Sequence, residues 1–404
     1  MDTITHLVSG GLLGKAYFSN DRDNFQGRVS ILAVTFGSIF PDSDIVIEAF
    51  SRDPLAIAKI HRGFTHSFIG LPIFAALFAW LTRWGLRKWG RDCPSTGLLF
   101  LAYAVGIASH ILLDGMTSFG TRMWMPISNA RVAWDLLFIV DFGFSAILLV
   151  PQIAAWVYSG REKVVSKAIA MWALCSAGTI GVWEIARAIE FPFSLWWALL
   201  IVIVVAGLFF LPMWNGNGFK IGRAAWCRGG VYAAAAYLVA CGFALQRRMM
   251  RVEQFAEANH VAVHRMGALP IPPSLFDWTG LIRSEGGVYQ ARFDLRNPQP
   301  PVFTAIADSP PNPLIAEARA LQEVRTYFWF ARFPMIHFEP GGERDIVEFS
   351  DLRFFDRTGK RPRSFVFQVV FDKNGNVLEE GWVGRLTYPQ PNLGTGPGTK
   401  GNSN

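Results

Sequence analysis

A histidine and an aspartate close a long apolar segment of this sequence. Residues 98–113 are apolar almost throughout, and the segment closes with His110 and Asp114. On a helix, residues four apart lie one above the other on the same face. An ionisable pair is expensive to bury at the end of a membrane-type segment, so by default it marks a functional site. The simpler alternative is a helix end capped by a solvated His and Asp.

Other histidines and aspartates lie at the ends of apolar segments before residue 142. They are His6, Asp42, Asp44, His61, His66, Asp135 and Asp141. Imidazole nitrogens combined with carboxylate oxygens form the ligand set of zinc, manganese or iron, whereas Ca²⁺ and Mg²⁺ are held almost entirely by oxygen. We therefore predict a site for one or two divalent ions, zinc above all. The predicted ligands are His6, Asp44, His66, His110 and Asp114.

The predicted chemistry is hydrolysis. One bound ion would lower the pKa of a water ligand to about 7, and two ions would stabilise both the attacking and the leaving oxygen of a phosphate ester. An uncoordinated carboxylate, Asp42 or Asp141, is the predicted general base. Asp141 is expected nearly two turns inside a membrane helix, where a purely solvated role is disfavoured.

Simpler roles stay open for several of these residues. His6 can be a helix-start residue, and Asp42 and Asp44 can form a turn and an N-cap after the preceding proline. His61 lies five residues before His66 and need not share its face, so His66 is the better candidate ligand. Three arginines at the same end either hold a phosphate or pair with the carboxylates. They are Arg62, Arg122 and Arg131.

The composition is that of a membrane protein with room for a second domain. Hydrophobic residues make up 51% of the 404 residues and charged residues 17%, below the usual quarter of a soluble protein. A net charge of +7 is typical of basic loops held against anionic lipid. No basic run has interleaved aromatic residues, so we expect no nucleic-acid partner. The four scattered cysteines form no CxxC pair and read as small buried side chains.

The apolar segments predict an α-helical integral membrane bundle of about six to eight membrane helices. The start of the chain lacks the basic region of a signal peptide, so we expect the first helix to be retained. Basic residues gather in alternate loops, which places those loops in the cytoplasm and the His/Asp residues at the opposite end. The segments are 3–18, 29–40, 68–84, 97–118, 134–158, 168–189, 194–213 and 229–246.

The composition changes after the last apolar segment. Charges become frequent and strand-like alternation appears, which predicts a small soluble α+β domain on the extracytoplasmic side. Its predicted elements are a strand at 288–294, a helix at 315–331 and a hairpin of 365–371 with 377–382. The predicted parts of the chain are 1–150 with the site, 151–250 with further transmembrane helices, 251–390 with the soluble domain, and a disordered Gly- and Pro-rich tail at 391–404.

Taken together, these motifs resemble a known family. Thr5-His6, Pro41-Asp42-Ser43-Asp44, His61-Arg62-Gly63-Phe64-Thr65-His66-Ser67 and His110-Ile-Leu-Leu-Asp114 are similar to the YdjM-like inner-membrane proteins, a family of membrane-bound metal-dependent hydrolases. The resemblance covers residues 1–150 well. It implies a multi-pass protein of the inner membrane whose first 150 residues form a metal-dependent hydrolase domain.

A more distant similarity is to zinc-dependent phospholipase C and the P1-type nucleases. Those enzymes take their metal ligands in the order His, Asp, His and HisxxxAsp. The residues in that order here are His6, Asp42 or Asp44, His66, His110 and Asp114. The sequence departs from the pattern because no histidine lies between residues 110 and 260. A third ion is therefore not expected, unless Asp135 or Asp141 substitutes for a missing ligand.

We predict a membrane-bound hydrolase of an ester or phosphodiester, with membrane lipid as its partner and a phospholipid headgroup as a candidate substrate. A transporter or ion pathway is a rival prediction, and it requires ionisable residues through the depth of several spans. A membrane scaffold with a structural metal is another, and it requires closed coordination. The sequence predicts no particular protein partner.

Overall fold

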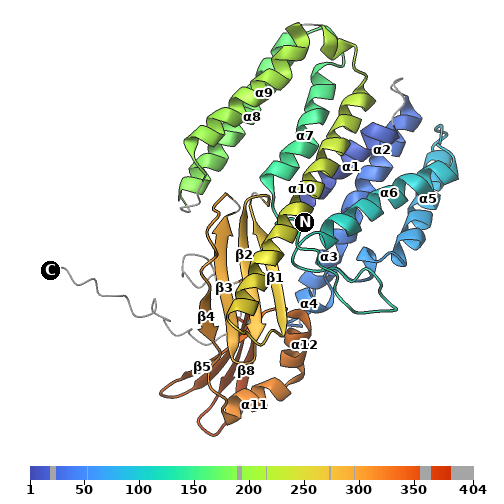
Figure 1. The fold of residues 1–404 in the computed structure, drawn as a ribbon. Helices are drawn as coiled ribbons and strands as arrows, with labels where there is room; N and C mark the ends of the chain where they lie inside the picture. The colour runs from blue at the N-terminus through green and yellow to red at the C-terminus, as the bar shows by residue number, and fades with distance from the viewer. Residues whose placement is uncertain are drawn as a thin grey trace.

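The computed structural model describes residues 1–18, 24–51, 53–188, 193–214, 216–272, 274–294, 296–354 and 365–383. A bundle of helices forms one half of the molecule, and two β-sheets with two short helices form the other half (Figure 1). The predicted tail at 391–404 lies outside the described residues.

The helices of the bundle follow the apolar segments of the sequence. Polar side chains cap several of their N-termini: Asp2 accepts a hydrogen bond from the Thr5 amide, and Ser95 accepts one from the Leu98 amide. The helices are α1 (Thr3–Tyr17), α2 (Phe25–Ile39), α5 (Gly70–Lys88), α6 (Thr96–Gly115), α7 (Phe142–Val157), α8 (Val164–Ala188), α9 (Leu195–Trp214) and α10 (Arg223–Ala258).

Five helical segments of the described part are long and apolar enough to cross a membrane. The number becomes six if the bent pair at 56–66 and 70–88 counts as one span. The helices α1 and α7, with 15 and 16 residues, are shorter than the roughly 20 residues that a span needs. Helix length and composition therefore give five or six candidate spans, and the number of membrane helices stays a prediction.

Close packing of small residues brings α1, α2 and α6 together. A Cβ atom added to Gly37 of α2 would lie 2.7 Å from the carbonyl oxygen of Tyr103 in α6. A Cβ atom on Gly106 of α6 would in turn collide with the carbonyl oxygen of Val34. Only glycine permits this backbone approach, which is how closely packed membrane helices are commonly built. The end of α2 is thereby placed directly beside the last turns of α6.

Four short helices connect α2 to α5 at the lower end of the bundle. Pro41 lies in the first turn of η1 and ends the regular α-helix there. This stretch carries four of the nine histidines and aspartates singled out in the sequence, namely Asp42, Asp44, His61 and His66. Its elements are η1 (Phe40–Ser43), α3 (Asp44–Ala49), α4 (Ala56–Lys59) and η2 (Phe64–His66).

The prediction of a helix over 134–158 is wrong in its first eight residues. The helix α7 begins at Phe142, and Asp141 is its N-cap. The preceding residues are extended, and their amides bond to the end of α6: Trp134 to the Gly115 carbonyl and Leu136 to the Met116 carbonyl. A short apolar run fits a buried extended segment as well as a helix, so hydrophobicity alone does not separate the two.

The C-terminal part contains two four-stranded antiparallel sheets. The predicted strand and hairpin are present, whereas the predicted helix at 315–331 is broken at Leu321 into two helices. The first sheet has the order β1 (Arg265–Ile271), β2 (Asp277–Ser284), β3 (Gly287–Asp294) and β4 (Thr304–Ala307). The second has β5 (Pro334–Pro340), β6 (Asp345–Asp351), β7 (Val366–Phe371) and β8 (Val377–Trp382), and α11 (Pro313–Ala320) and α12 (Gln322–Phe330) join the sheets.

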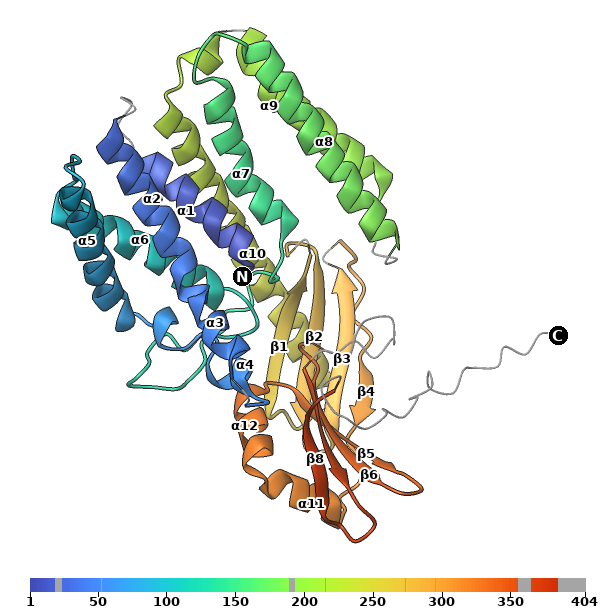
Figure 2. The ribbon, with the colours of Figure 1, turned by 180° about the vertical axis from the view of Figure 1, so that it is seen from behind.

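The C-terminal part lies against the lower end of the bundle, as the two views show (Figures 1 and 2). Arg332 binds Asp135 through two hydrogen bonds of 2.7 Å. Burial opposes the charge of Arg332, but the hydrogen bonds with Asp135 raise its pKa above the ordinary value. Arg353 donates to the carbonyl oxygens of Ser118 and Phe119, and Phe119 packs on Phe330. These contacts fasten the C-terminal part to the end of the bundle that carries the candidate site.

Candidate metal centre

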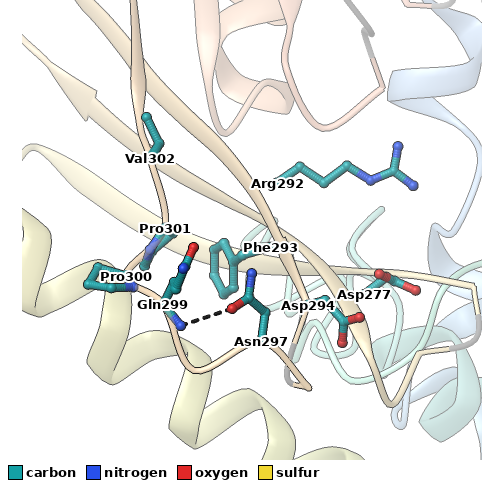
Figure 3. Close-up of a pocket in the computed structure, with 9 residues that line it drawn as sticks. All are labelled: Asp277, Arg292, Phe293, Asp294, Asn297, Gln299, Pro300, Pro301 and Val302. Carbon is teal, nitrogen blue, oxygen red and sulfur yellow. Dashed lines mark hydrogen bonds between the residues drawn. The ribbon is translucent and has the colours of Figure 1, made fainter.

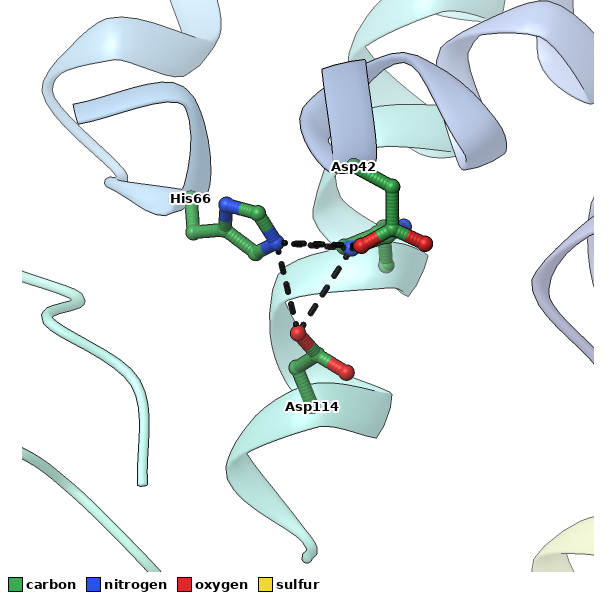
Figure 4. Close-up of side chains that lie close together, drawn as sticks. Asp42, His66 and Asp114 are labelled. Carbon is green, nitrogen blue, oxygen red and sulfur yellow. Dashed lines mark hydrogen bonds and ion pairs between the residues drawn. The ribbon is translucent and has the colours of Figure 1, made fainter. Parts of the chain in front are cut away.

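Four side chains from three elements converge at the lower end of the bundle. They are Asp42 of η1, His66 of η2, and His110 and Asp114 of α6. Figure 4 labels Asp42, His66 and Asp114. One nitrogen or oxygen atom of each lies within 4.8 Å of the corresponding atoms of the other three. His66, His110 and Asp114 are fully buried, and the Asp42 side chain is 8% exposed. The predicted i, i+4 pair of α6 therefore does face the interior of the bundle.

The hydrogen bonds behind the two imidazoles decide which nitrogen of each carries a proton. His110 Nδ1 lies 2.7 Å from the carbonyl oxygen of Ser38, which can only accept, so Nδ1 is the donor. His66 Nδ1 lies 3.1 Å from the Thr65 hydroxyl and 3.3 Å from a carboxylate oxygen of Asp44. Because the Thr65 hydroxyl donates to that Asp44 oxygen, it accepts from His66 Nδ1. In the neutral rings both Nε2 atoms then carry lone pairs, and these atoms are 3.0 Å apart. Two lone pairs do not bond to each other, so a proton on one ring or a metal ion must lie between them.

The four separations between a carboxylate oxygen and an imidazole nitrogen fit a tetrahedral ion, whereas the two Nε2 atoms are closer, at 3.0 Å. Metal–ligand bonds of 2.0–2.2 Å in a tetrahedron place neighbouring ligand atoms about 3.3–3.6 Å apart. Asp42 Oδ1 lies 3.6 Å from His66 Nε2 and 3.4 Å from His110 Nε2. Asp114 Oδ2 lies 3.3 Å and 3.6 Å from the same two atoms. The donor set of two imidazoles and two carboxylates is one that zinc, manganese or iron accepts.

The local fold explains why these atoms meet. Ser38 is in the last turn of α2, where carbonyl groups lack helical partners, and its carbonyl holds the His110 ring. Thr3 at the start of α1 donates a hydrogen bond of 2.8 Å to Asp42 Oδ2 and so turns Oδ1 toward the histidines. Ser38 and Thr3 could not be predicted from the sequence, because no sequence pattern marks a carbonyl or hydroxyl group whose hydrogen-bond partner lies on another helix.

The structure separates the two aspartates of the Pro-Asp-Ser-Asp motif. Asp42, predicted as a general base, lies in the group of four. Asp44, predicted as a ligand, lies behind His66 and also accepts from His61 Nδ1 at 2.9 Å and from the Arg62 amide at 2.9 Å. A carboxylate behind a ligand histidine fixes its tautomer and its orientation.

His6 lies beside the group of four and outside it. Its ring stacks on the His110 ring with centroids 3.6 Å apart, and its Nε2 is 3.1 Å from Asp114 Oδ1, the oxygen turned away from the other ligands. The amino nitrogen of Met1 contacts the same oxygen. The Nδ1 atom of His6 is buried without a partner. The prediction that His6 binds a metal therefore stays a prediction.

Asp141, the other predicted general base, is placed elsewhere. As the N-cap of α7 it accepts from the Phe144 amide at 3.0 Å. Its second oxygen accepts from the Tyr237 hydroxyl at 2.8 Å and from the Ser274 amide at 3.1 Å. Three donors occupy this carboxylate, and they join α7, α10 and the segment before β2. Its position is that of a structural junction.

Arg62 connects the group of four to the surrounding loop. Its Nε atom is 2.9 Å from Asp114 Oδ2, and its Nη1 atom donates to the Thr117 hydroxyl at 2.9 Å. Its φ angle is +58°, a region that non-glycine residues rarely adopt. Backbone strain of this kind persists only where several contacts enforce it, and it is common at functional sites.

A separate hollow of about 400 Å³ lies on the first sheet (Figure 3). Asp277 and Asp294 face each other there across β2 and β3, and Asp294 is paired with Arg296 at 2.7 Å. None of the four converging side chains lines it. Its walls are Asp277, Arg292, Phe293, Asp294, Asn297, Gln299, Pro300, Pro301 and Val302.

Comparison with known families agrees with the resemblance seen in the motifs. Residues 1–185 match the family model described as YdjM inner membrane protein. The matched part contains all four converging side chains and ends within α8. Searches of curated proteins and of solved structures gave no match. The resemblance to this family of inner-membrane proteins is thus confirmed for the first 185 residues.

Proposed function

We propose that the protein is a membrane-bound, metal-dependent hydrolase that cleaves an ester or phosphodiester. One observation supports this above the others: two imidazole nitrogens and two carboxylate oxygens converge, with carboxylate–imidazole separations of 3.3–3.6 Å. The donor set favours zinc, with one ion for the group. When bound, such an ion supplies a water molecule whose pKa is lowered to about 7.

In the proposed mechanism the four side chains divide into ligands and a base. His66, His110 and Asp114 are fully buried and would hold the ion as its three protein ligands. Asp42 is the one side chain of the four that is exposed, at 8%, and it would accept a proton from the attacking water. Thr3 holds Asp42 in position, and Asp44 keeps the proton of His66 on Nδ1.

The membrane setting follows from the family and the helices. In this proposal the protein is a multi-pass protein of the inner membrane, with the basic loops of the opposite end in the cytoplasm. The metal centre and the C-terminal part then face the extracytoplasmic side. A centre at the end of the bundle lies at the depth of the lipid headgroups, which makes a phospholipid a candidate substrate. The basic residues of those loops are Lys15, Arg28, Arg87, Lys88, Arg91, Arg161, Lys163, Lys167, Lys220 and Arg223.

A structural metal is the second candidate, and one observation favours it. If Asp42 is a fourth ligand, the coordination is complete and no position is left for water. The transporter alternative has less support, because the ionisable residues of the described bundle gather at its ends. The pair Glu184–Arg187 of α8 is exposed, at 56% and 69%, and does not line an interior path.

The test combines metal content with hydrolysis. The full chain is purified in detergent, its metal is measured by mass spectrometry, and bis(p-nitrophenyl) phosphate and p-nitrophenyl acetate are offered as substrates. We expect about one zinc ion per chain, and hydrolysis that a chelator abolishes and zinc restores. His110→Ala should remove both, whereas His337→Ala, at an exposed histidine of β5, should change neither. Stoichiometric metal without hydrolysis would favour the structural role, and no metal would contradict the proposal.

A further inference from the structure

We propose that Arg122 and Arg131 form a subsite that binds the phosphoryl group of the substrate next to the metal centre. This inference rests on the proposed function and narrows its substrate from esters in general to phosphate esters. The two arginines lie in the irregular segment between α6 and α7, and both guanidinium groups contact Trp329 of α12 in the C-terminal part.

Both guanidinium groups donate hydrogen bonds to backbone carbonyls of residues 58–61, in the loop that leads to His66. Arg122 Nη2 donates to the carbonyl oxygens of Lys59 at 2.6 Å and Ile60 at 3.2 Å. Arg131 Nη2 donates to the carbonyl oxygens of Ala58 and His61. The next residue along the loop is Arg62, whose Nε contacts the ligand Asp114. The two guanidinium groups are therefore held by the residues that directly precede Arg62, which contacts the metal centre.

Neither charge is matched by a carboxylate. Among the described residues, no Asp or Glu oxygen lies within 4.0 Å of Arg122 or Arg131, and the Nε atom of each is buried without a hydrogen-bond partner. Burial lowers the pKa of both groups, although a guanidinium keeps its proton in proteins. A buried cation with free donors and no counter-ion is costly, and a bound anion would remove that cost.

A charge count of the whole site gives the class of anion. The carboxylates Asp42, Asp44 and Asp114 balance the guanidinium groups of Arg62, Arg122 and Arg131, if the histidines and the Met1 amino group are neutral. A divalent ion then leaves two positive charges without a partner. A phosphate monoester or inorganic phosphate carries about two negative charges near pH 7, a diester carries one, and a carboxylic ester carries none. The subsite should thus prefer a dianionic phosphate.

Aromatic rings from both halves of the molecule enclose the subsite. The Arg131 guanidinium lies 5.1 Å from the Trp329 ring and 5.2 Å from the Phe330 ring, both in α12. It also lies 5.5 Å from Phe119, and Arg122 lies 5.8 Å from Trp329. Rings of this kind exclude water and strengthen the attraction between a guanidinium and an anion. The C-terminal part would in this way complete the substrate site.

The competing explanation is that the arginines only hold the loop by capping the carbonyls at the end of α4. Two substitutions separate the explanations. Arg131→Gln keeps an amide donor for a carbonyl but loses the charge. Arg131→Lys keeps the charge but loses the planar fork of donors. If the arginine binds phosphate, the variant that loses the positive charge, Arg131→Gln, should be the weaker one. If the arginine only holds the loop, the variant that loses the planar set of donors, Arg131→Lys, should be the weaker one.

The experiment measures binding of inorganic phosphate to the zinc-loaded full chain in phosphatidylcholine nanodiscs by calorimetry. We expect Arg131→Gln and Arg122→Gln to weaken binding about 10- to 100-fold, as loss of a charge-assisted hydrogen bond does. Arg131→Lys should stay within about threefold, and zinc content and melting temperature should stay constant in all of them. Arg161→Gln is the matched control, since Arg161 also stacks on an aromatic ring, Phe219, at the opposite end of the bundle.

Equal phosphate affinity in wild type and Arg131→Gln would overturn the subsite, as would a larger loss in Arg131→Lys than in Arg131→Gln. Either result leaves the proposed hydrolase intact if zinc is retained and a neutral ester is cleaved. Absence of zinc from the wild type would instead contradict the proposed function. Two further arms identify the source of the phosphate: competition by phosphatidic acid in the nanodisc indicates a lipid headgroup, and competition by dissolved glycerol phosphate alone indicates a free phosphate.

Discussion

Two buried carboxylates at the same end of the bundle have different surroundings. Asp141 meets three hydrogen-bond donors, and each of its oxygens is satisfied by the protein itself. Asp114 also meets donors, since Oδ1 contacts the Met1 amino group and His6, and Oδ2 lies 2.9 Å from Arg62 Nε. Its Oδ2, however, also lies 3.3 Å and 3.6 Å from the Nε2 atoms of His66 and His110, which face a second carboxylate, Asp42. Burial of a carboxylate therefore does not identify a metal site; the convergence of several metal-ligand atoms on one point does.

The comparison is tested most strongly by removing a ligand. Asp114→Ala should reduce bound zinc from about one ion per chain to nearly none, because a catalytic zinc needs three protein ligands. Asp141→Ala should leave the zinc content unchanged. Mass spectrometry of both purified variants measures this, and equal zinc loss in the two would remove the distinction between the sites.

The residue behind a ligand should have a smaller effect. Asp44→Asn removes the carboxylate that fixes the His66 tautomer, and we expect zinc affinity to fall about 10- to 100-fold. Competition with a zinc indicator dye gives the dissociation constant. Asp53→Asn is the matched control, because Asp53 pairs with Lys59 on the surface of the same loop. An unchanged affinity in Asp44→Asn would show that the tautomer is set by other contacts.

Asp141 should matter for stability instead of metal binding. Asp141→Ala loses an N-cap and leaves the buried Tyr237 hydroxyl without its acceptor, which should cost about 1–3 kcal/mol of unfolding free energy. Thermal unfolding in detergent measures the loss. Tyr237→Phe should cost less, since it removes one donor and leaves two. A larger effect on hydrolysis than on stability would return Asp141 to its predicted catalytic role.

The smallest expected effect concerns the contact between the two halves of the molecule. Arg332→Gln removes a bidentate pair with Asp135 whose side chains are 21% and 10% exposed, and the loss should be about 1 kcal/mol. We expect hydrogen exchange in residues 116–141 to be faster in the variant than in the wild type, with unchanged zinc content. A loss of zinc would mean that the C-terminal part supports the metal centre directly.

Much of the fold could be predicted from the sequence, because hydrophobic patterns along the chain are local features. Each predicted apolar segment contains a helix, and the hairpin at 366–382 follows the alternating pattern of its strands. The i, i+4 spacing of His110 and Asp114 placed both on one face, and that face is buried. The segment at 134–141 was mispredicted, because its apolar side chains pack in extended form against the end of α6 and local hydrophobicity is the same in either case.

The site was only partly predictable, and the two neighbouring aspartates show why. Asp42 and Asp44 are two residues apart and chemically identical, so the sequence alone could not decide which one binds. The 3-10 turn of η1 directs Asp42 to the histidines, and the short α3 directs Asp44 to the back of His66. The same holds for Asp141, whose role depends on a tyrosine 96 residues further along the chain.

The sequence by itself determined the apolar helices, the end of the bundle where ionisable groups gather, and the residue types that a metal would need, because these follow from spacing and composition. Only the tertiary structure decided which of those groups share one point, which carry lone pairs there, and which are already satisfied. The physical reason is that a proton position or a metal bond depends on partners such as the Ser38 carbonyl, which reaches His110 only once α2 and α6 have packed.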